Sequence, residues 1–224
     1  MGPVSFFQKL FGGGAQKPPE TVQPSGARIN RRSSGLKEFF RNLEGQECLS
    51  VLDLGATSAT NIAWLTNRGH ALYTEDVLTS AWDSALQITG EDGKPTLDVV
   101  RFMAENMRFQ GRSFDAVLCW DVADYLPEAL VKPVVEKMCS VMKPGGTLLA
   151  FFHTRDAGPD APYYRYHLAG NEMLQLQATT KGGGPQFRLQ RVFNNRHIEN
   201  LFREFASLKF FLARDNVREV IVVR

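Results

Sequence analysis

The segment "VLDLGATSATN", Val51–Asn61, decides the fold of this chain. Its apolar beginning predicts a buried β-strand, and Gly55 predicts a tight turn directly after that strand. Ligands of an open parallel sheet bind at the carboxyl ends of its strands, so this turn is the first candidate for a binding site. The turn carries one glycine, whereas the dinucleotide-binding pattern G-x-G-x-x-G carries three.

The missing glycines bear on which cofactor the turn can hold. Thr57 stands where the second glycine of the dinucleotide pattern lies, and its side chain would crowd a diphosphate. NAD and FAD are therefore disfavoured, and a nucleotide-dependent oxidoreductase is the second alternative function. S-adenosylmethionine carries no phosphate, so a turn with one glycine and small neighbours can still pass beside its methionine part.

Strand-like and helix-like segments alternate from residue 36 onward, which predicts a parallel sheet with helices on its faces. We expect helices over residues 36–43, 61–68, 81–88, 127–142 and 197–205. We expect core strands over residues 49–54, 71–74, 98–103, 114–120, 147–153, 208–213 and 219–223. This is an α/β sheet of about seven strands.

Two segments depart from this alternation. Residues 155–194 contain three stretches of alternating polar and apolar residues, 163–168, 173–179 and 187–193, which predict a small antiparallel β insertion. Residues 1–34 are expected to be a flexible N-terminal segment, since 12–34 are rich in Gly, Pro, Ser, Gln and Arg. The basic pair in "RRSS", Arg31–Ser34, is expected to be solvated. Residues 35–224 then form one domain.

Composition excludes several classes of function. The chain has 224 residues, 43% of them hydrophobic and 22% charged, and its net charge of +2 is too small to indicate a nucleic-acid surface. Its three cysteines match no metal or disulfide spacing, which favours reduced, buried thiols in a cytoplasmic protein. No secretory signal or membrane-spanning run is present, but the apolar face within residues 4–11 predicts a weak contact with a membrane or a partner.

Several motifs together resemble one family. They are "VLDLGA" at the first strand, "LYTEDV" at the second, "AENMRFQGRSFDAVLCWDV", "MKPGG" before the fifth strand and "REVIVV" near the end. Over about Val51–Phe151 the chain resembles the class I S-adenosylmethionine-dependent methyltransferases, above all the type 11 group. The resemblance implies a doubly wound, Rossmann-like sheet of seven strands, mostly parallel, whose last strand is antiparallel. It also implies S-adenosylmethionine as the cofactor.

The resemblance assigns roles to individual residues. Asp53 would hold the amino group of the cofactor, Gly55 would allow the close turn, and Asp76 or its neighbour Glu75 would bind the ribose. Met103 replaces the usual adenine-binding aspartate, which is a departure from the family like Thr57 and Ala59 in the turn. The full set of implied cofactor-binding residues is Asp53, Gly55, Ala56, Thr57, Glu75, Asp76, Val77, Met103, Ala104, Trp120 and Asp121.

No catalytic motif is apparent, so the catalytic residues stay unassigned. Methyl transfer depends mainly on alignment of the nucleophile with the methyl group, and a base is needed only when the acceptor keeps its proton near neutral pH. We expect a small-molecule acceptor in a pocket supplied by the insertion, with Asp121, Tyr125 and His153 as candidate contacts and the tyrosines at 163, 164 and 166 as packing. The alternative is a non-catalytic, methyltransferase-like binding or scaffold protein.

Overall fold

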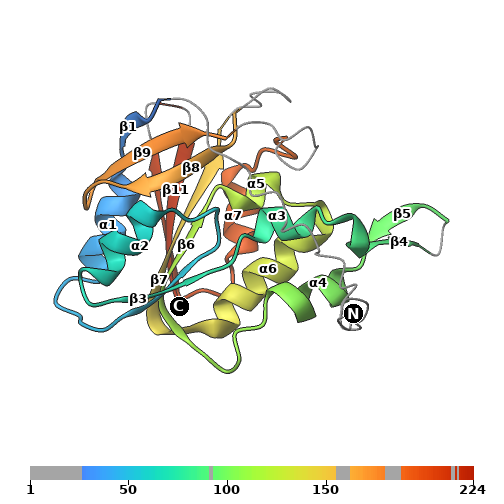
Figure 1. Ribbon diagram of the computed structural model, residues 1–224, viewed down its shortest axis with the longest axis horizontal. Helices are drawn as coiled ribbons and strands as arrows, with labels where there is room; N and C mark the ends of the chain where they lie inside the picture. Colours follow the sequence, from blue (N-terminus) through green and yellow to red (C-terminus); the bar gives the residue numbers. More distant parts are fainter. Residues whose placement is uncertain (1–26, 91–92, 155–161, 180–187, 213–214, 216) are drawn as a thin grey trace, which may run out of the picture.

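A six-stranded sheet forms the centre of the molecule (Figure 1). The structure, a computed structural model, describes residues 27–90, 93–154, 162–179, 188–212, 215 and 217–224. The strand order is β10-β11-β7-β6-β2-β3, in which β7, β6, β2 and β3 run parallel and β11 runs antiparallel to both its neighbours. The strands are β2 (Ser50–Asp53), β3 (Ala71–Thr74), β6 (Phe114–Trp120), β7 (Met142–His153), β10 (Ser207–Leu212) and β11 (Val217–Val223).

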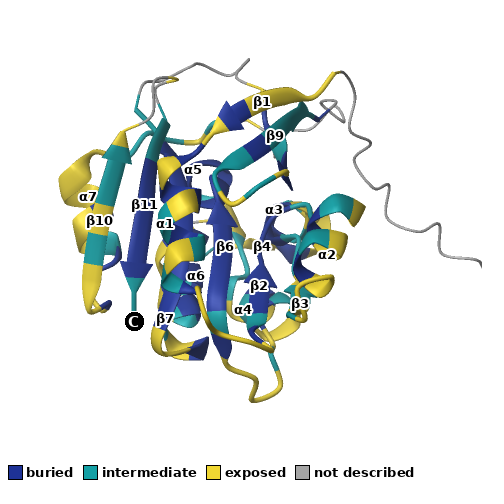
Figure 2. Ribbon diagram, turned by 90° about the vertical axis from the view of Figure 1, so that its left-hand side faces the viewer, coloured by how far each residue is buried: buried dark blue, intermediate teal, exposed yellow. Residues whose placement is uncertain are grey.

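Helices cover both faces of this sheet, as the alternating pattern predicts. The helices are α1 (Ser34–Asn42), α2 (Ala59–Thr66), α3 (Val77–Ala81), α4 (Val99–Asn106), α5 (Val122–Tyr125), α6 (Glu128–Val141) and α7 (Asn195–Leu201), with a 3-10 turn at Ser84–Leu86. Strand β6 is buried on both faces: Ala116, Leu118 and Trp120 face the core beneath α1 and α2, while Val117 and Cys119 face the core beneath the other helices (Figure 2).

A second, three-stranded sheet crosses the carboxyl end of the main sheet (Figures 1 and 2). It consists of β1 (Ile29–Arg32), β9 (Met173–Ala178) and β8 (Tyr164–Leu168), in that order and antiparallel. Strands β8 and β9 confirm two strands of the predicted insertion. The third predicted strand is wrong, because residues 188–193 form no strand and β1 takes the outer position instead.

Residues 29–34 were expected to belong to a flexible linker, and the structure places them in strand β1 and at the start of α1. The side chain of Arg31 is buried, lies 5.0 Å from the ring of Phe151 and forms ion pairs with Asp215 and Glu219. Arg32 is exposed, as expected. Residues 1–26, including the apolar face at 4–11, lie outside the described residues.

Two predicted elements between β3 and β6 are wrong. The expected strand at 98–103 is helix α4, because the carboxylate of Asp98 accepts a hydrogen bond from the backbone N–H of Arg101 (2.9 Å) and starts a helix whose Phe102 is buried. The expected helix at 81–88 is divided between α3, the 3-10 turn and β4 (Gln87–Thr89), which pairs with β5 (Pro95–Leu97). The main sheet therefore has six strands within the described ranges.

Two further expectations concern the environment of the protein. Cys119 is buried, but Cys48 is exposed and Cys139 is partly exposed, so the expectation of three buried thiols is wrong. Among the described residues, no helix has the length and apolar character needed to cross a membrane. A cytoplasmic location stays a prediction.

The burial of Arg31 makes a prediction about stability. R31A leaves the Glu219 carboxylate buried without its cation, so we expect the free energy of unfolding to fall by about 3 kcal/mol. R32A, which removes an exposed arginine from the same strand, should have little effect. Urea unfolding of both variants checks this, and equal effects would contradict a structural role for Arg31.

Candidate functional site

The turn after β2 is built around the buried carboxylate of Asp53, the last residue of that strand. One carboxylate oxygen, Oδ1, accepts hydrogen bonds from the indole N–H of Trp120 (2.7 Å) and from the backbone N–H of Gly55 (3.2 Å). Burial raises the pKa of Asp53, and the hydrogen bond from Trp120 acts in the opposite direction. The predicted turn is therefore formed, and the carboxylate already has a neutral hydrogen-bond donor in the indole N–H.

Trp120 covers the glycine of this turn. A Cβ atom at residue 55 would lie 2.6 Å from Cδ1 of the Trp120 ring, so the indole requires glycine there. Tyr166, on β8, stacks on the other side of the indole, with 5.0 Å between ring centroids and 5° between ring planes. Trp120 has a backbone φ of 52°, in the left-handed region that side chains rarely adopt. Such strained residues are concentrated at binding sites and switches.

Asp121, the next residue, is also buried. Its Oδ2 accepts a hydrogen bond from the hydroxyl of Tyr166 (2.8 Å), while its Oδ1 is buried with no hydrogen-bond partner in the described part of the chain. Burial raises the pKa of Asp121 to about 6, although the nearby His153 and the Tyr166 hydrogen bond lower it. An unpartnered buried carboxylate oxygen is costly to stability and is typical of a functional site.

A histidine–aspartate pair lies beside Asp121. Oδ2 of Asp124, on α5, accepts hydrogen bonds from the backbone N–H of His153 and from its ring Nδ1, both at 2.7 Å. Burial lowers the pKa of His153, but the hydrogen bond to Asp124 and the charges of Asp121, Asp124 and Asp215 outweigh it, so the pKa is raised. Because Nδ1 donates to Asp124, the neutral ring has Nε2 as a proton acceptor.

His153 borders a hollow between the small sheet and the ends of β7 and β11. The hollow has a volume of about 410 Å³. Its lining is mainly apolar and aromatic, with His153 and a few other polar groups: Ile29, Asn30, Arg31, His153, Pro162, Tyr164, Tyr166, Leu176, Asp215 and Val217. Tyr125 is fully buried and packs edge-on against His153 and Tyr163 rather than lining the hollow.

The two acidic candidates for the ribose lie directly after β3. Both carboxylate oxygens of Asp76 are engaged with Thr79, accepting from its N–H (3.1 Å) and its hydroxyl (3.0 Å) at the start of α3. Glu75 is half-buried, and its carboxylate makes no hydrogen bond or ion pair within the described ranges, while its backbone N–H donates to the backbone oxygen of Asp53 (2.9 Å). Burial, together with the charge of Asp76, raises the pKa of Glu75. Glu75 is thus the freer carboxylate of the two.

The remaining predicted residues are divided between two places. Ala56 and Thr57 lie half-buried in the turn after β2. Met103 and Ala104 lie on α4, where Met103 packs against the core and Ala104 is exposed. Val77 is fully buried among core side chains. The structure thus brings Asp53, Gly55 and Trp120 into contact and links Asp121 to them through Tyr166. Val77 lies beside the same turn, since its N–H donates to the backbone oxygen of Leu54 (3.4 Å).

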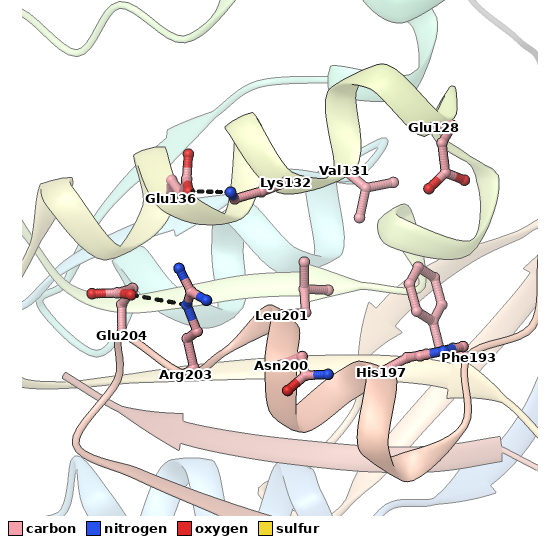
Figure 3. Close-up of a pocket in the computed structure, with 10 residues that line it drawn as sticks. All are labelled: Glu128, Val131, Lys132, Glu136, Phe193, His197, Asn200, Leu201, Arg203 and Glu204. Atoms are coloured by element: carbon pink, nitrogen blue, oxygen red, sulfur yellow. Dashed lines mark hydrogen bonds and ion pairs between the residues drawn. The ribbon is translucent and has the colours of Figure 1, made fainter.

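Asp124 is a candidate functional residue that is not among those predicted from the sequence. The signal was available, because Asp124 follows Asp121 by three residues, one helical turn, directly after a buried strand. A groove elsewhere, of about 320 Å³ between α6 and α7, is lined by Val131, Leu201, His197 and several charged side chains (Figure 3). None of the predicted site residues lines this groove.

Part of the chain is similar to a known protein family. The family model described as a methyltransferase domain matches residues 51–146, from β2 into β7. Residues 51–146 are thus similar to a methyltransferase domain, as the class I motifs within them predict. Domains of this class use S-adenosylmethionine as their cofactor, in agreement with the resemblance of the turn after β2. No curated protein sequence matches the chain.

Solved methyltransferase structures are similar to this one at low sequence identity. The 1,6-didemethyltoxoflavin-N1-methyltransferase of Burkholderia thailandensis is 12% identical, with 86% of this chain and 79% of that chain covered and a TM-score of 0.46. The magnesium protoporphyrin IX methyltransferase of Synechocystis PCC 6803, bound to S-adenosylhomocysteine, is 16% identical, with 84% and 79% covered and a TM-score of 0.47. Likeness at this level gives no information about the acceptor of this methyltransferase domain.

The residues at the turn fit this cofactor in kind. A carboxylate at the end of β2, a glycine that permits close approach and two acidic residues after β3 are all present. The position of the Trp120 indole does not fit a cofactor bound at this turn, because the indole covers Gly55 and its N–H already donates a hydrogen bond to Asp53. A cofactor that placed its methionine end at Asp53 and Gly55, as predicted from the sequence, would require the Trp120 side chain to move.

The raised pKa of Asp121 predicts how stability depends on pH. The folded protein holds this proton more tightly than the unfolded chain, so its stabilising effect is present below about pH 4 and is lost as the pH rises through about 6. At pH 8 we expect D121N to have a higher free energy of unfolding in urea than the wild type, by up to about 3 kcal/mol. Near pH 4 the two proteins should have the same free energy of unfolding. A pH-independent difference would show that the charge of Asp121 is not the cause.

Proposed function

We propose that this methyltransferase transfers the methyl group of S-adenosylmethionine to a hydroxyl group of a small, mainly apolar molecule. The observation that carries the proposal is the His153–Asp124 pair, in which His153 lines the hollow. The same hollow is lined by Tyr166, which stacks on Trp120 beside the turn after β2. When bound, S-adenosylmethionine supplies an electrophilic methyl group. The residues of the chain have to bind the acceptor, align it and remove its proton.

The hollow supports a small-molecule acceptor. Its volume of about 410 Å³ lies within the range of small-molecule sites, about 300 to 1,000 Å³. The side chains of Tyr164, Tyr166 and Leu176 provide aromatic and apolar contact area. The charged side chains in the lining, Arg31 and Asp215, are paired with each other, so a flat molecule with one or two polar substituents suits the lining better than a sugar or a nucleotide.

The His153–Asp124 pair supports a hydroxyl as the reacting group. An alcohol or phenol keeps its proton near neutral pH, so its methylation benefits from a base. Nε2 of neutral His153 accepts that proton, and the buried carboxylate of Asp124 stabilises the resulting imidazolium while holding the ring in one orientation. Asp124 is thus a positioning residue for His153.

The turn and the end of β3 are proposed to hold the cofactor. Asp53 binds the amino group, and Gly55 with Ala56 and Thr57 forms the surface beside the methionine part. Glu75 binds the ribose hydroxyls together with Asp76, and its free carboxylate favours it as the main ligand. Met103 and Ala104 stay predicted adenine contacts.

Calorimetry of the full chain with S-adenosylmethionine and S-adenosylhomocysteine tests the cofactor. We expect both to bind, and we expect E75A and D76A to weaken binding about tenfold or more because a charge-assisted hydrogen bond to ribose is lost. D83A is the matched control, since Asp83 caps the 3-10 turn in the same way as Asp76 caps α3. Absence of binding by both compounds at millimolar concentration would rule out the proposed enzyme.

The pH dependence of methylation tests the base, with a panel of small phenols and aromatic alcohols as acceptors. His153 acts when neutral, so kcat/KM should rise with pH through the raised pKa of His153. D124N removes the hydrogen bond and the charge that raise this pKa, so the rising limb should move to lower pH and the plateau should fall.

We also expect H153Q to lower the rate by about 10²- to 10⁴-fold without affecting cofactor binding. H197A, which changes a histidine in the groove between α6 and α7, is the control and should leave the profile unchanged. A rising limb at the same pH in D124N and wild type would contradict the role of this pair.

A further inference from the structure

The side chain of Trp120 stands between the two halves of the proposed active site. Its indole lies against Gly55, and its N–H donates to Asp53, which is fully buried. On the other side it stacks on Tyr166, whose ring also lines the hollow beside His153. The same side chain therefore touches the surface proposed for the cofactor and a wall of the hollow proposed for the acceptor.

The hydrogen bond to Asp53 resembles the one that the cofactor would make. An ammonium group and an indole N–H are both donors, and Oδ1 of Asp53 is the acceptor for the indole. The other oxygen, Oδ2, faces the side-chain amide of Asn61 at 3.5 Å, so a ligand whose amino group is to reach Oδ1 has to displace the indole N–H. The indole and the methionine end of the cofactor would thus compete for the same acceptor, Oδ1 of Asp53, and for the same space beside Gly55.

Two features connect the position of Trp120 to its contacts. Its backbone lies in the left-handed region with φ 52°, which an L side chain adopts only when its surroundings hold it there. Two of the contacts that hold it are the Asp53 hydrogen bond and the stack on Tyr166. Tyr166 belongs to the small sheet, which is hydrogen-bonded to α2 through the side chain of Asn61.

We propose that Trp120 is a gate that closes the methionine end of the cofactor site, with its indole N–H in the place of the cofactor's ammonium group. This inference rests on the proposed function. Cofactor binding moves the indole away from Gly55 and Asp53 and breaks its stack on Tyr166. The closed form lowers the apparent affinity for the cofactor by the fraction of molecules in which the gate is open.

Calorimetry with S-adenosylhomocysteine on the full chain tests the gate. We expect W120A to bind at least tenfold more tightly than the wild type, because no indole has to be displaced. W120F keeps a ring that can stack on Tyr166 but lacks the N–H, so its affinity should lie between the two. W64F is the matched control, since Trp64 lies on α2 against Phe40 and Arg68, and its affinity should equal that of the wild type.

Fluorescence provides a second measurement that does not depend on W120A folding. Binding of S-adenosylhomocysteine should change the tryptophan emission of the wild type and of W64F, and this change should be absent in W120F. Y166L, which removes the stacked ring from the other strand, should also bind more tightly than the wild type.

The outcomes separate the gate from the proposed function. Equal or weaker binding by W120A and Y166L, in proteins that do bind S-adenosylhomocysteine, would overturn the gate and leave the methyltransferase proposal standing. Binding by W120A alone would support the gate in its strongest form. Failure of the wild type and of every variant to bind would overturn both proposals.

Discussion

The buried carboxylate of Asp53 is the constraint on which this structure depends. A carboxylate removed from water has to be supplied with hydrogen bonds, and here the donors come from different elements. Trp120 reaches it from β6 and Gly55 from the following turn. Asn61 of α2, 3.5 Å away, bonds in turn to the backbone of Tyr166 and Leu168 on β8. One buried charge thereby connects the main sheet, a helix and the small sheet.

Two further buried carboxylates, on Asp121 and Asp124, also need hydrogen-bond donors. Asp121 and Asp124 follow β6 directly, and each has one buried carboxylate oxygen with no hydrogen-bond partner among the described residues. Tyr166 and His153 bind the other oxygens. Burial raises the pKa of both carboxyl groups, so this edge of the sheet is less stable than an apolar core would be. Such an arrangement is typical of a site in which protons are held or moved.

The small sheet covers the carboxyl end of the main sheet. Strand β8 brings Tyr166 to Trp120, and β1 completes the sheet from the N-terminal side of the chain. Arg31 fastens β1 to the main sheet through Glu219, and Ser33 donates to the same glutamate while it caps α1. The lining of the hollow therefore comes from segments at both ends of the described chain.

The sequence by itself determined the parallel strands at β2, β3 and β6, the helices that follow β2 and β6, and the glycine turn. These depend on hydrophobic periodicity, caps and turn residues, which act between neighbours in the chain. It did not determine α4, where the Asp98 cap outweighed an apolar run that is equally compatible with a strand. Only the tertiary structure decided that β1 pairs with β9, that Arg31 is buried and that Trp120 lies on Gly55. The reason is physical: which donor satisfies a buried charge depends on residues far apart in sequence, and no local pattern records that choice.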